Sequence, residues 1–296
     1  MSPLVILAAL AAVILWGASP VAAKVAVGDL SAISVALLRT FVGGLMAVPV
    51  ALAVRMPLPG TRRLKLILLL TGFCGFIAFP IPFTIGLKMT SANHASMILA
   101  ALPITTGAIA MLWDRRRPTR IWIIGSVIAL IGEAVLIGGR QGTGGVNQPS
   151  LAGDLLVLVS NFAASLGYVA GGRLQQAGYP STGTTFWGAA AMALVLTPVV
   201  AALGLFGGLG AELAAAPAKS WIAILYLAAV STILGYVLWY WALGKGGIAR
   251  VGLMQFLQPV SGVILAAILL GEQVGASFLA ASAVILFGVW LAIRGK

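Results

Sequence analysis

Long apolar stretches follow one another along almost the whole chain, and this pattern restricts the fold more than any other feature. A transmembrane helix needs about 20 apolar residues to cross the hydrocarbon core of a bilayer. Ten such stretches can be read, at about residues 3–23, 30–54, 64–86, 91–112, 118–138, 151–172, 182–206, 219–243, 249–270 and 275–293. The longest connection covers residues 138–150, so the sequence leaves no room for a soluble domain.

The composition indicates membrane insertion by helices. Hydrophobic residues make up 61% of the chain and charged residues 8%, and the mean hydropathy is +1.10. Soluble domains are roughly half apolar and a quarter charged. Residues 264–270 are apolar on every side, which favours helices over the alternating strands of a membrane β-barrel. We therefore expect an all-α polytopic membrane protein with ten transmembrane helices.

The basic residues divide unevenly between the connections and predict an orientation. If both termini are cytoplasmic, the cytoplasmic side holds Arg55, Arg62, Arg63, Lys65, Arg115, Arg116, Arg117, Arg120, Arg173, Lys245, Arg250, Arg294 and Lys296. The outer side holds only Lys24, Lys88, Arg140 and Lys219. This asymmetry follows the positive-inside rule. It also explains the net charge of +12 without a nucleic-acid partner, for which the chain shows no basic motif.

Several classes of site are excluded by what the sequence lacks. Cys74 is the single cysteine and His94 the single histidine, so we expect no disulfide, metal site or other cofactor in a monomer. A phosphate-binding loop is also absent, which argues against direct use of ATP. The first apolar stretch has no Lys or Arg ahead of it and is interpreted as a retained helix rather than a signal peptide.

An internal repeat appears when the chain is shifted by 156 residues. The shift aligns Leu87 with Leu243, Pro103 with Pro259, Ala110 with Ala266, Ser126 with Ser282, Gly132 with Gly288 and Ile137 with Ile293. We expect two repeats, at residues 1–147 and 148–296, each with five spans. Because five is odd, the second repeat must be inverted in the membrane. Inverted repeats are typical of secondary transporters, whose substrate cavity lies between the repeats near the midplane.

A proline lies at the same point of the fourth span in each repeat. Pro103 and Pro259 remove a backbone donor, which is expected to leave the carbonyls of Leu99 and Gln255 without their usual partners. Such backbone is tolerated beside a cavity or within packed protein, and both interpretations stay open. Polar neighbours, which favour the cavity, are Thr105, Thr106, Gln255 and Gln258.

Trp16 is a first candidate for substrate contact. It lies well inside the first span, whereas the other tryptophans lie near span ends, where indole rings favour the headgroup region. The adjacent Gly17 leaves room for a ligand or for another backbone. Trp16 either stacks on an aromatic or cationic substrate or packs within the bundle.

A polar stripe in the sixth span is a second candidate. Asn161, Ser165 and Tyr168 follow the spacing i, i+4, i+7, which places them on one helix face. They either line the cavity or join helices by hydrogen bonds. His94 either senses protons and contacts substrate or is structural. The candidate substrate-binding residues are Trp16, His94, Asn161, Ser165, Tyr168, Gln255 and Gln258.

Two ionisable residues, Arg39 and Glu133, lie well inside spans, both in the outer half of the membrane by the expected orientation. Buried charges of opposite sign at similar depth usually pair. We therefore expect Arg39 and Glu133 to interact or to share the bundle interior, and assign them, with Pro103 and Pro259, a structural or gating role.

Four segments carry a family resemblance. They are Trp16-Gly17-Ala18-Ser19-Pro20 followed by Lys24, Arg39 in the second span, Thr90-Ser91-Ala92, and Leu269-Leu270-Gly271-Glu272. In this order they resemble the drug/metabolite transporter superfamily, specifically its ten-helix EamA type, over the full length. The chain departs from the family pattern at Trp113-Asp114-Arg115-Arg116, where a Gly-Glu pair is common, and at Ser165-Leu166, which replaces Trp-Ala.

The resemblance implies export of small metabolites or drugs across the bacterial inner membrane. Within the type, the chain resembles the YddG-like exporters of aromatic amino acids. A small-molecule substrate and the lipid bilayer are the expected partners, and a monomer suffices. One alternative is a passive channel or facilitator, although the sequence shows no ring of charges. Another is an intramembrane enzyme, because residues 163–167 come close to a Gly-x-Ser-x-Gly loop.

Overall fold

The computed structural model describes residues 2–138, 150–246, 251 and 253–294, which are nearly all helical and contain no strand. The helices up to residue 138 are α1 (Pro3–Gly17), α2 (Ser19–Asp29), α3 (Ala32–Ala53), α4 (Arg62–Phe73), η1 (Cys74–Ala78), α5 (Pro80–Lys88), α6 (Ala92–Ile98), η2 (Leu99–Ala101), α7 (Leu102–Asp114) and α8 (Arg120–Gly138). The later ones are α9 (Leu151–Gln176), α10 (Ser181–Phe206), α11 (Leu209–Ala215), α12 (Ala218–Leu225), η3 (Tyr226–Leu234), α13 (Gly235–Gly246), η4 (Leu253–Phe256), α15 (Leu257–Leu270) and α16 (Ala276–Arg294).

Seven helical stretches in the described residues are long and apolar enough to cross a membrane. They are Pro3–Asp29, Ala32–Ala53, Arg62–Lys88, Ala92–Trp113, Leu151–Gln176, Ser181–Phe206 and Ala218–Gly246. The apolar helices α8, α15 and α16 occupy the places of the other three expected spans. The all-α polytopic fold is therefore confirmed, whereas the count of ten spans stays a prediction.

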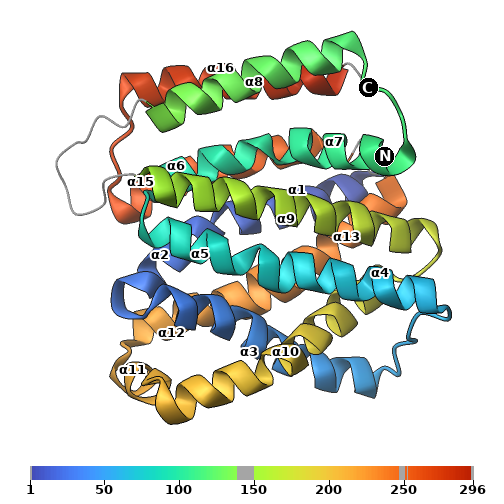
Figure 1. Ribbon diagram of the computed structural model, residues 1–296, viewed down its shortest axis with the longest axis vertical. Helices are drawn as coiled ribbons and strands as arrows, with labels where there is room; N and C mark the ends of the chain where they lie inside the picture. Colours follow the sequence, from blue (N-terminus) through green and yellow to red (C-terminus); the bar gives the residue numbers. More distant parts are fainter. Residues whose placement is uncertain (1, 139–149, 247–250, 252, 295–296) are drawn as a thin grey trace.

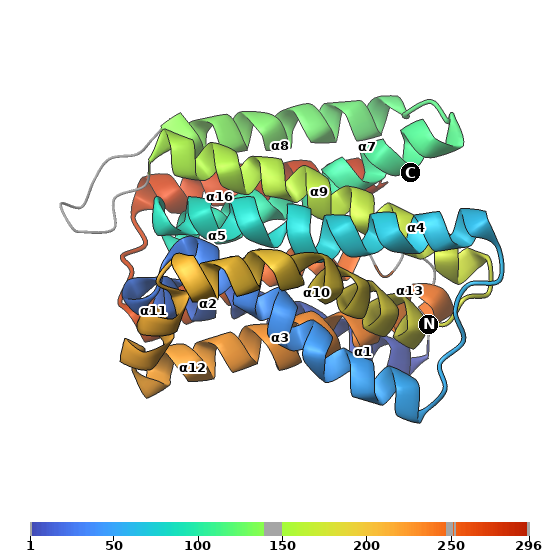
Figure 2. The ribbon, with the colours of Figure 1, turned by 60° about the horizontal axis from the view of Figure 1, so that its bottom comes forward.

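The helices run side by side along one bundle (Figures 1 and 2). Helix α8 packs along α16 at one edge, and α3 packs along α10 on the opposite side. Helix α1 begins and α16 ends at the same end of the bundle. The connection from α3 to α4 and the end of α9 lie at that end too, whereas α11 lies at the other.

Glycine allows the backbones of α8 and α16 to approach closely. A Cβ added at Gly288 would lie 2.3 Å from the Ala129 backbone nitrogen, and one at Gly125 would lie 2.2 Å from the Ala292 nitrogen. Small residues are common where membrane helices meet, because association there depends on close packing.

The same helical irregularities occur in both halves of the chain. The π-helical segment η1 follows α4, and the π-helical segment η3 follows α12. The amide of Phe79 donates to the carbonyl of Cys74, and the amide of Gly235 donates to the carbonyl of Val230, in each case five residues back. The 3₁₀ turn η2 precedes α7, and η4 precedes α15. Each irregular segment falls near its counterpart under the shift of 156 residues.

The prolines sit directly after the two 3₁₀ turns. Pro103 and Pro259 lie in the first turns of α7 and α15, where a missing backbone N–H costs little. The carbonyl of Leu99 accepts a hydrogen bond from the amide of Leu102. The Leu99 carbonyl therefore has a donor three residues on in place of its usual donor at position 103, which is proline.

Some sequence predictions lie outside the described residues. These are the boundary between the repeats at residues 147–148 and the assigned sides of Arg140, Arg250 and Lys296.

Candidate substrate site

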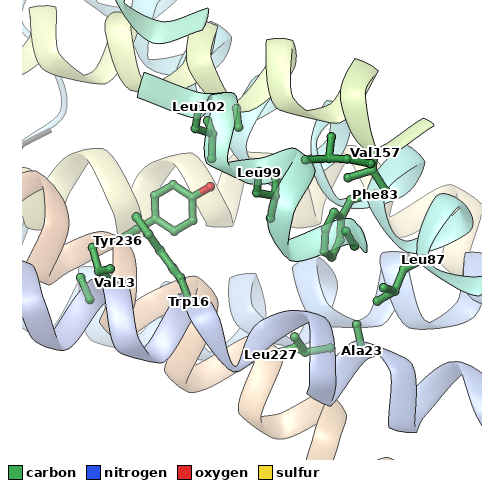
Figure 3. Packing of buried hydrophobic residues seen from close by; sticks show 14 of the residues in the cluster. Val13, Trp16, Ala23, Phe83, Leu87, Leu99, Leu102, Val157, Leu227 and Tyr236 are labelled. Carbon is green, nitrogen blue, oxygen red and sulfur yellow. The ribbon is translucent and has the colours of Figure 1, made fainter. Parts of the chain in front are cut away.

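Trp16 belongs to a buried aromatic cluster, which comprises Trp16, Phe76, Tyr168, Tyr236, Trp239 and Tyr240. The ring of Trp16 stacks on Tyr168 at a centroid distance of 5.8 Å and meets the edge of Tyr236 at 5.1 Å. Figure 3 shows Trp16 and Tyr236 beside each other in the packed interior. The structure therefore brings two of the predicted site residues, Trp16 and Tyr168, into contact.

Tyr236 and Trp239 were missed as site residues by sequence reasoning. Trp239 was expected near the headgroups, but it is 1% exposed and its ring lies 5.5 Å from that of Trp16. The expectation is wrong because α13 directs this face toward α1 and α10 rather than toward lipid. The spacing of Tyr236, Trp239 and Tyr240 as i, i+3, i+4 could have revealed the inward face.

Gly17 makes room for another backbone, the second of the two options left open by the sequence. A Cβ added at Gly17 would lie 2.9 Å from the carbonyl oxygen of Gln258 and 1.9 Å from the hydroxyl oxygen of Ser261. Gln258 and Gln255 are buried, and among the described residues Gln258 Oε1 and Gln255 Nε2 have no hydrogen-bond partner. The first turns of α15 therefore lie close to the end of α1, and Gln258 in this part of α15 carries an unpaired amide oxygen among the described residues.

Ser231, in the π-helical segment η3, connects Trp16 with Arg39. Trp16 Nε1 donates to the Ser231 carbonyl at 2.9 Å, and Arg39 Nη2 donates to the Ser231 hydroxyl at 3.4 Å. The same hydroxyl lies 2.7 Å from that of Ser19. On the other side, Thr40 donates to the carbonyl of Phe76 in η1 at 2.5 Å. Both π-helical segments thus border the residues around Arg39.

Arg39 is 3% exposed, and its Nε and Nη1 atoms have no hydrogen-bond partner in the described part of the chain. Its guanidinium is within electrostatic range of the hydroxyls of Tyr168 and Tyr236. Glu133 is also buried, at 2% exposure. The predicted Arg39–Glu133 ion pair is wrong, because α3 packs on α10 and η3 whereas α8 packs on α16. The two residues do share the buried interior.

Asn161 and Ser165 join helices in this structure. Asn161 Nδ2 donates to the Ile98 carbonyl at 3.1 Å, directly before the 3₁₀ turn η2. The Ser165 hydroxyl lies 2.5 Å from that of Thr105 and accepts from Thr106 at 3.1 Å. Helix α9 is thereby fixed to the irregular stretch from α6 to α7. Ser165 contacts Thr105 and Thr106, whereas His94 faces Asp154, so within the described residues these two side chains do not form the serine–histidine pair that a hydrolase would need.

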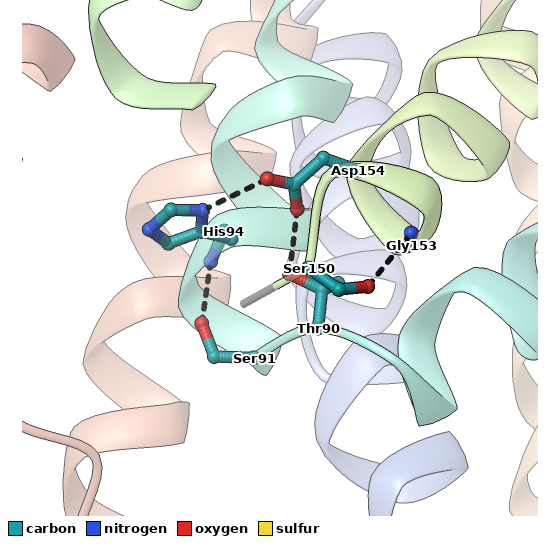
Figure 4. A network of polar contacts seen from close by, with 6 residues as sticks. All are labelled: Thr90, Ser91, His94, Ser150, Gly153 and Asp154. Atoms are coloured by element: carbon teal, nitrogen blue, oxygen red, sulfur yellow. Dashed lines mark hydrogen bonds and ion pairs between the residues drawn. The ribbon is translucent and has the colours of Figure 1, made fainter. Parts of the chain in front are cut away.

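His94 lies in a separate polar network at the end of the bundle where α6 and α9 begin (Figure 4). His94 Nδ1 faces Asp154 Oδ2 at 3.5 Å, and the fully buried Asp154 accepts a hydrogen bond from Thr90 at 2.5 Å. Nearby, Glu272 accepts from the amides of Ala92 and Asn93 at 2.8 Å each. The ring neighbour of His94 is Phe278 rather than a member of the aromatic cluster.

Comparison with known proteins now decides the family. The model of the EamA-like transporter family matches residues 3–138 and 151–294. The chain belongs to the EamA-like transporter family. It is 29% identical over 286 residues to "Uncharacterized transporter YdeK" of Bacillus subtilis, covering 95% of this chain and 94% of that protein.

A second relative has a more specific name. The chain is 28% identical over 291 residues to "Probable amino-acid metabolite efflux pump" of Salmonella typhimurium, covering 97% of this chain and 94% of the relative. A solved crystal structure has the same fold, with a TM-score of 0.64 at 19% identity, covering 97% of this chain and 95% of the other. The protein is thus a multi-pass membrane transporter of the drug/metabolite superfamily.

Proposed function

We propose that this EamA-like transporter exports small metabolites, amino acids and aromatic compounds above all, from the cytoplasm by alternating access. The aromatic cluster forms the substrate site. Two five-helix repeats of opposite orientation, residues 1–147 and 148–296, rock about it. The proposed location is the bacterial inner membrane with both termini cytoplasmic, and a monomer suffices.

The arrangement of the helices supports the repeat. By its order in each half, α1 is the counterpart of α9, α13 that of α4 and α5, and α15 that of α7. Helix α1 packs on α13, and α9 packs on α4 and α5; likewise α1 packs on α15, and α9 packs on α7. The pairs α3 with α10 and α8 with α16 each map onto themselves. Because α1 begins and α16 ends at one end of the bundle, the packing also fits termini on one side of the membrane.

The observation that carries the proposal is the position of Arg39 and Trp16 between the two π-helical segments, one from each half. Both side chains bond Ser231 of η3, and Thr40 bonds Phe76 of η1. π-Helical bulges often occur at functional sites. Segments without regular α-helical bonding can change shape at lower cost than straight helices, which suits a site that opens alternately to each side.

Reconstitution into vesicles tests this function. Purified protein is expected to move labelled phenylalanine or tryptophan across the membrane, and a combined Trp16→Ala, Asn161→Ala, Gln258→Ala variant is expected to lose most of that transport. Transport that is unchanged in the folded triple variant would contradict the site. The assay is repeated with an imposed proton gradient. Accumulation driven by the gradient indicates antiport, whereas indifference to it supports the alternative of a passive facilitator.

A further inference from the structure

Arg39 carries a charge that the described protein does not balance. Five of the six acidic residues have partners elsewhere: Asp29 with Lys219 at 3.1 Å, Asp114 with Arg173, Asp154 with His94 at 3.5 Å, Glu212 with the Ser31 amide at 3.2 Å, and Glu272 with the amides of Ala92 and Asn93. The sixth, Glu133, lies on α8 at the opposite edge of the bundle from α3. No carboxylate of the described residues therefore pairs with Arg39.

Such a charge is costly in a membrane interior. Guanidinium stays protonated at any physiological pH, and an intramembrane charge normally pairs with a counter-charge or faces a polar cavity. Among the described residues, the one hydrogen bond that Arg39 makes is long, at 3.4 Å to the Ser231 hydroxyl. Two of its three nitrogens, Nε and Nη1, have no partner among the described residues although the side chain is 3% exposed. A carboxylate can accept two parallel hydrogen bonds from the Nη1/Nη2 edge or from the Nε/Nη2 edge of this guanidinium, because among the described residues Nη2 makes only the long bond to Ser231.

The surroundings of Arg39 match a substrate with an acidic end and an apolar body. The hydroxyls of Tyr168 and Tyr236 lie within electrostatic range of the guanidinium, and both rings belong to the cluster around Trp16. A carboxylate bound at Arg39 would therefore place the rest of a small molecule against aromatic faces.

We propose that Arg39 binds the carboxylate of the transported substrate, while the aromatic cluster contacts its apolar body. The substrates are then small organic acids, amino acids included, and amines of the same shape that lack the carboxylate are excluded. This inference rests on the proposed function and assigns Arg39 a binding role in place of the structural or gating role expected from the sequence.

Competition on the wild-type protein provides a test that needs no variant. Transport of labelled phenylalanine in vesicles is measured with unlabelled 3-phenylpropionate, which keeps the carboxylate, or phenethylamine, which lacks it. The inference predicts that the acid competes about 10- to 100-fold more strongly than the amine, the range expected for a hydrogen-bonded charge pair. Equal competition overturns the role of Arg39 and leaves the proposed function standing. Absence of transport for every acid tested overturns the proposed function, and the inference with it.

Variants test whether Arg39 causes the preference for the acid over the amine. The preference for the acid is expected to disappear in Arg39→Gln and to persist in part in Arg39→Lys. It is expected to be unchanged in the control Arg294→Gln, because Arg294 covers Trp290 at the end of α16. Elution as a single species and thermal unfolding establish that each variant folds. A folded Arg39→Gln protein that keeps the full preference contradicts the proposal. If Arg39→Gln does not fold, the wild-type competition still decides.

Discussion

Trp16 combines a structural and a functional role at the scale of one residue. Its ring stacks on Tyr168, and its Nε1 donates to Ser231. Trp16→Phe removes the hydrogen bond and part of the ring, so we expect a loss of about 1–3 kcal/mol in the free energy of unfolding, together with weaker transport. Thermal unfolding and vesicle transport measure the two effects. Trp290→Phe is the control, since Trp290 is 44% exposed, and an equal loss in both variants would contradict the assignment.

Two buried carboxylates are expected to respond in opposite ways to removal of their charge. Glu133 Oε1 has no hydrogen-bond partner in the described chain, whereas Asp154 accepts from Thr90 and faces His94. Glu133→Gln is expected to unfold at the same or a higher temperature, because glutamine cannot ionise and a charge without a counter-charge is costly in a membrane interior. Asp154→Asn is expected to lose about 1–3 kcal/mol. A greater loss in Glu133→Gln than in Asp154→Asn contradicts this interpretation.

Only part of the aromatic site could be predicted from the sequence. Trp16 stands out because it lies far from the ends of its span, and Tyr168 follows from regular α-helical spacing along α9. Ser231 and Tyr236 could not be related in that way, because η3 lies between α12 and α13 and its five-residue bonding shifts the helix faces. The sequence also could not predict that Arg39 and Glu133 lie apart, because similar depth in the membrane does not determine which helices are neighbours.

At the scale of the helices, close packing of α8 on α16 depends on glycine. Gly288→Ala would place a Cβ 2.3 Å from the Ala129 backbone nitrogen, so we expect a loss of about 1–3 kcal/mol from overpacking. Gly204→Ala in α10 is the matched control, because no atom lies within 4 Å of its added Cβ. It is expected to be neutral or to stabilise the helix by up to about 1 kcal/mol. Thermal unfolding that ranks the two variants in the reverse order would contradict the packing.

The lengths of the apolar stretches predicted where the chain is helical, but not where the helices are interrupted. Sequence hydropathy treats residues 64–86 as one span, whereas the structure divides this region into α4, η1 and α5. Hydropathy records which groups avoid water and carries no information on whether a backbone bond reaches four or five residues back. The interruptions depend on tertiary contacts, such as that of Thr40 with the Phe76 carbonyl.

In the molecule as a whole, two oppositely oriented halves are proposed to enclose one site. The connection after the second span of each half provides the sharpest comparison. Gly60 lies in the connection from α3 to α4 and Ala214 lies in α11, and both residues are exposed. These two segments lie at opposite ends of the bundle. Opposite orientation of the halves requires that the two residues face opposite sides of the membrane.

Labelling of single cysteines with a membrane-impermeant maleimide in intact cells measures this directly. Cys74 is the chain's only cysteine and is buried, so Cys74→Ala provides the background for Gly60→Cys and Ala214→Cys. If the halves are inverted and both termini are cytoplasmic, position 214 reacts in intact cells and position 60 reacts only after the membrane is opened. Reaction of both positions from the same side would contradict the inverted repeat and the mechanism built on it.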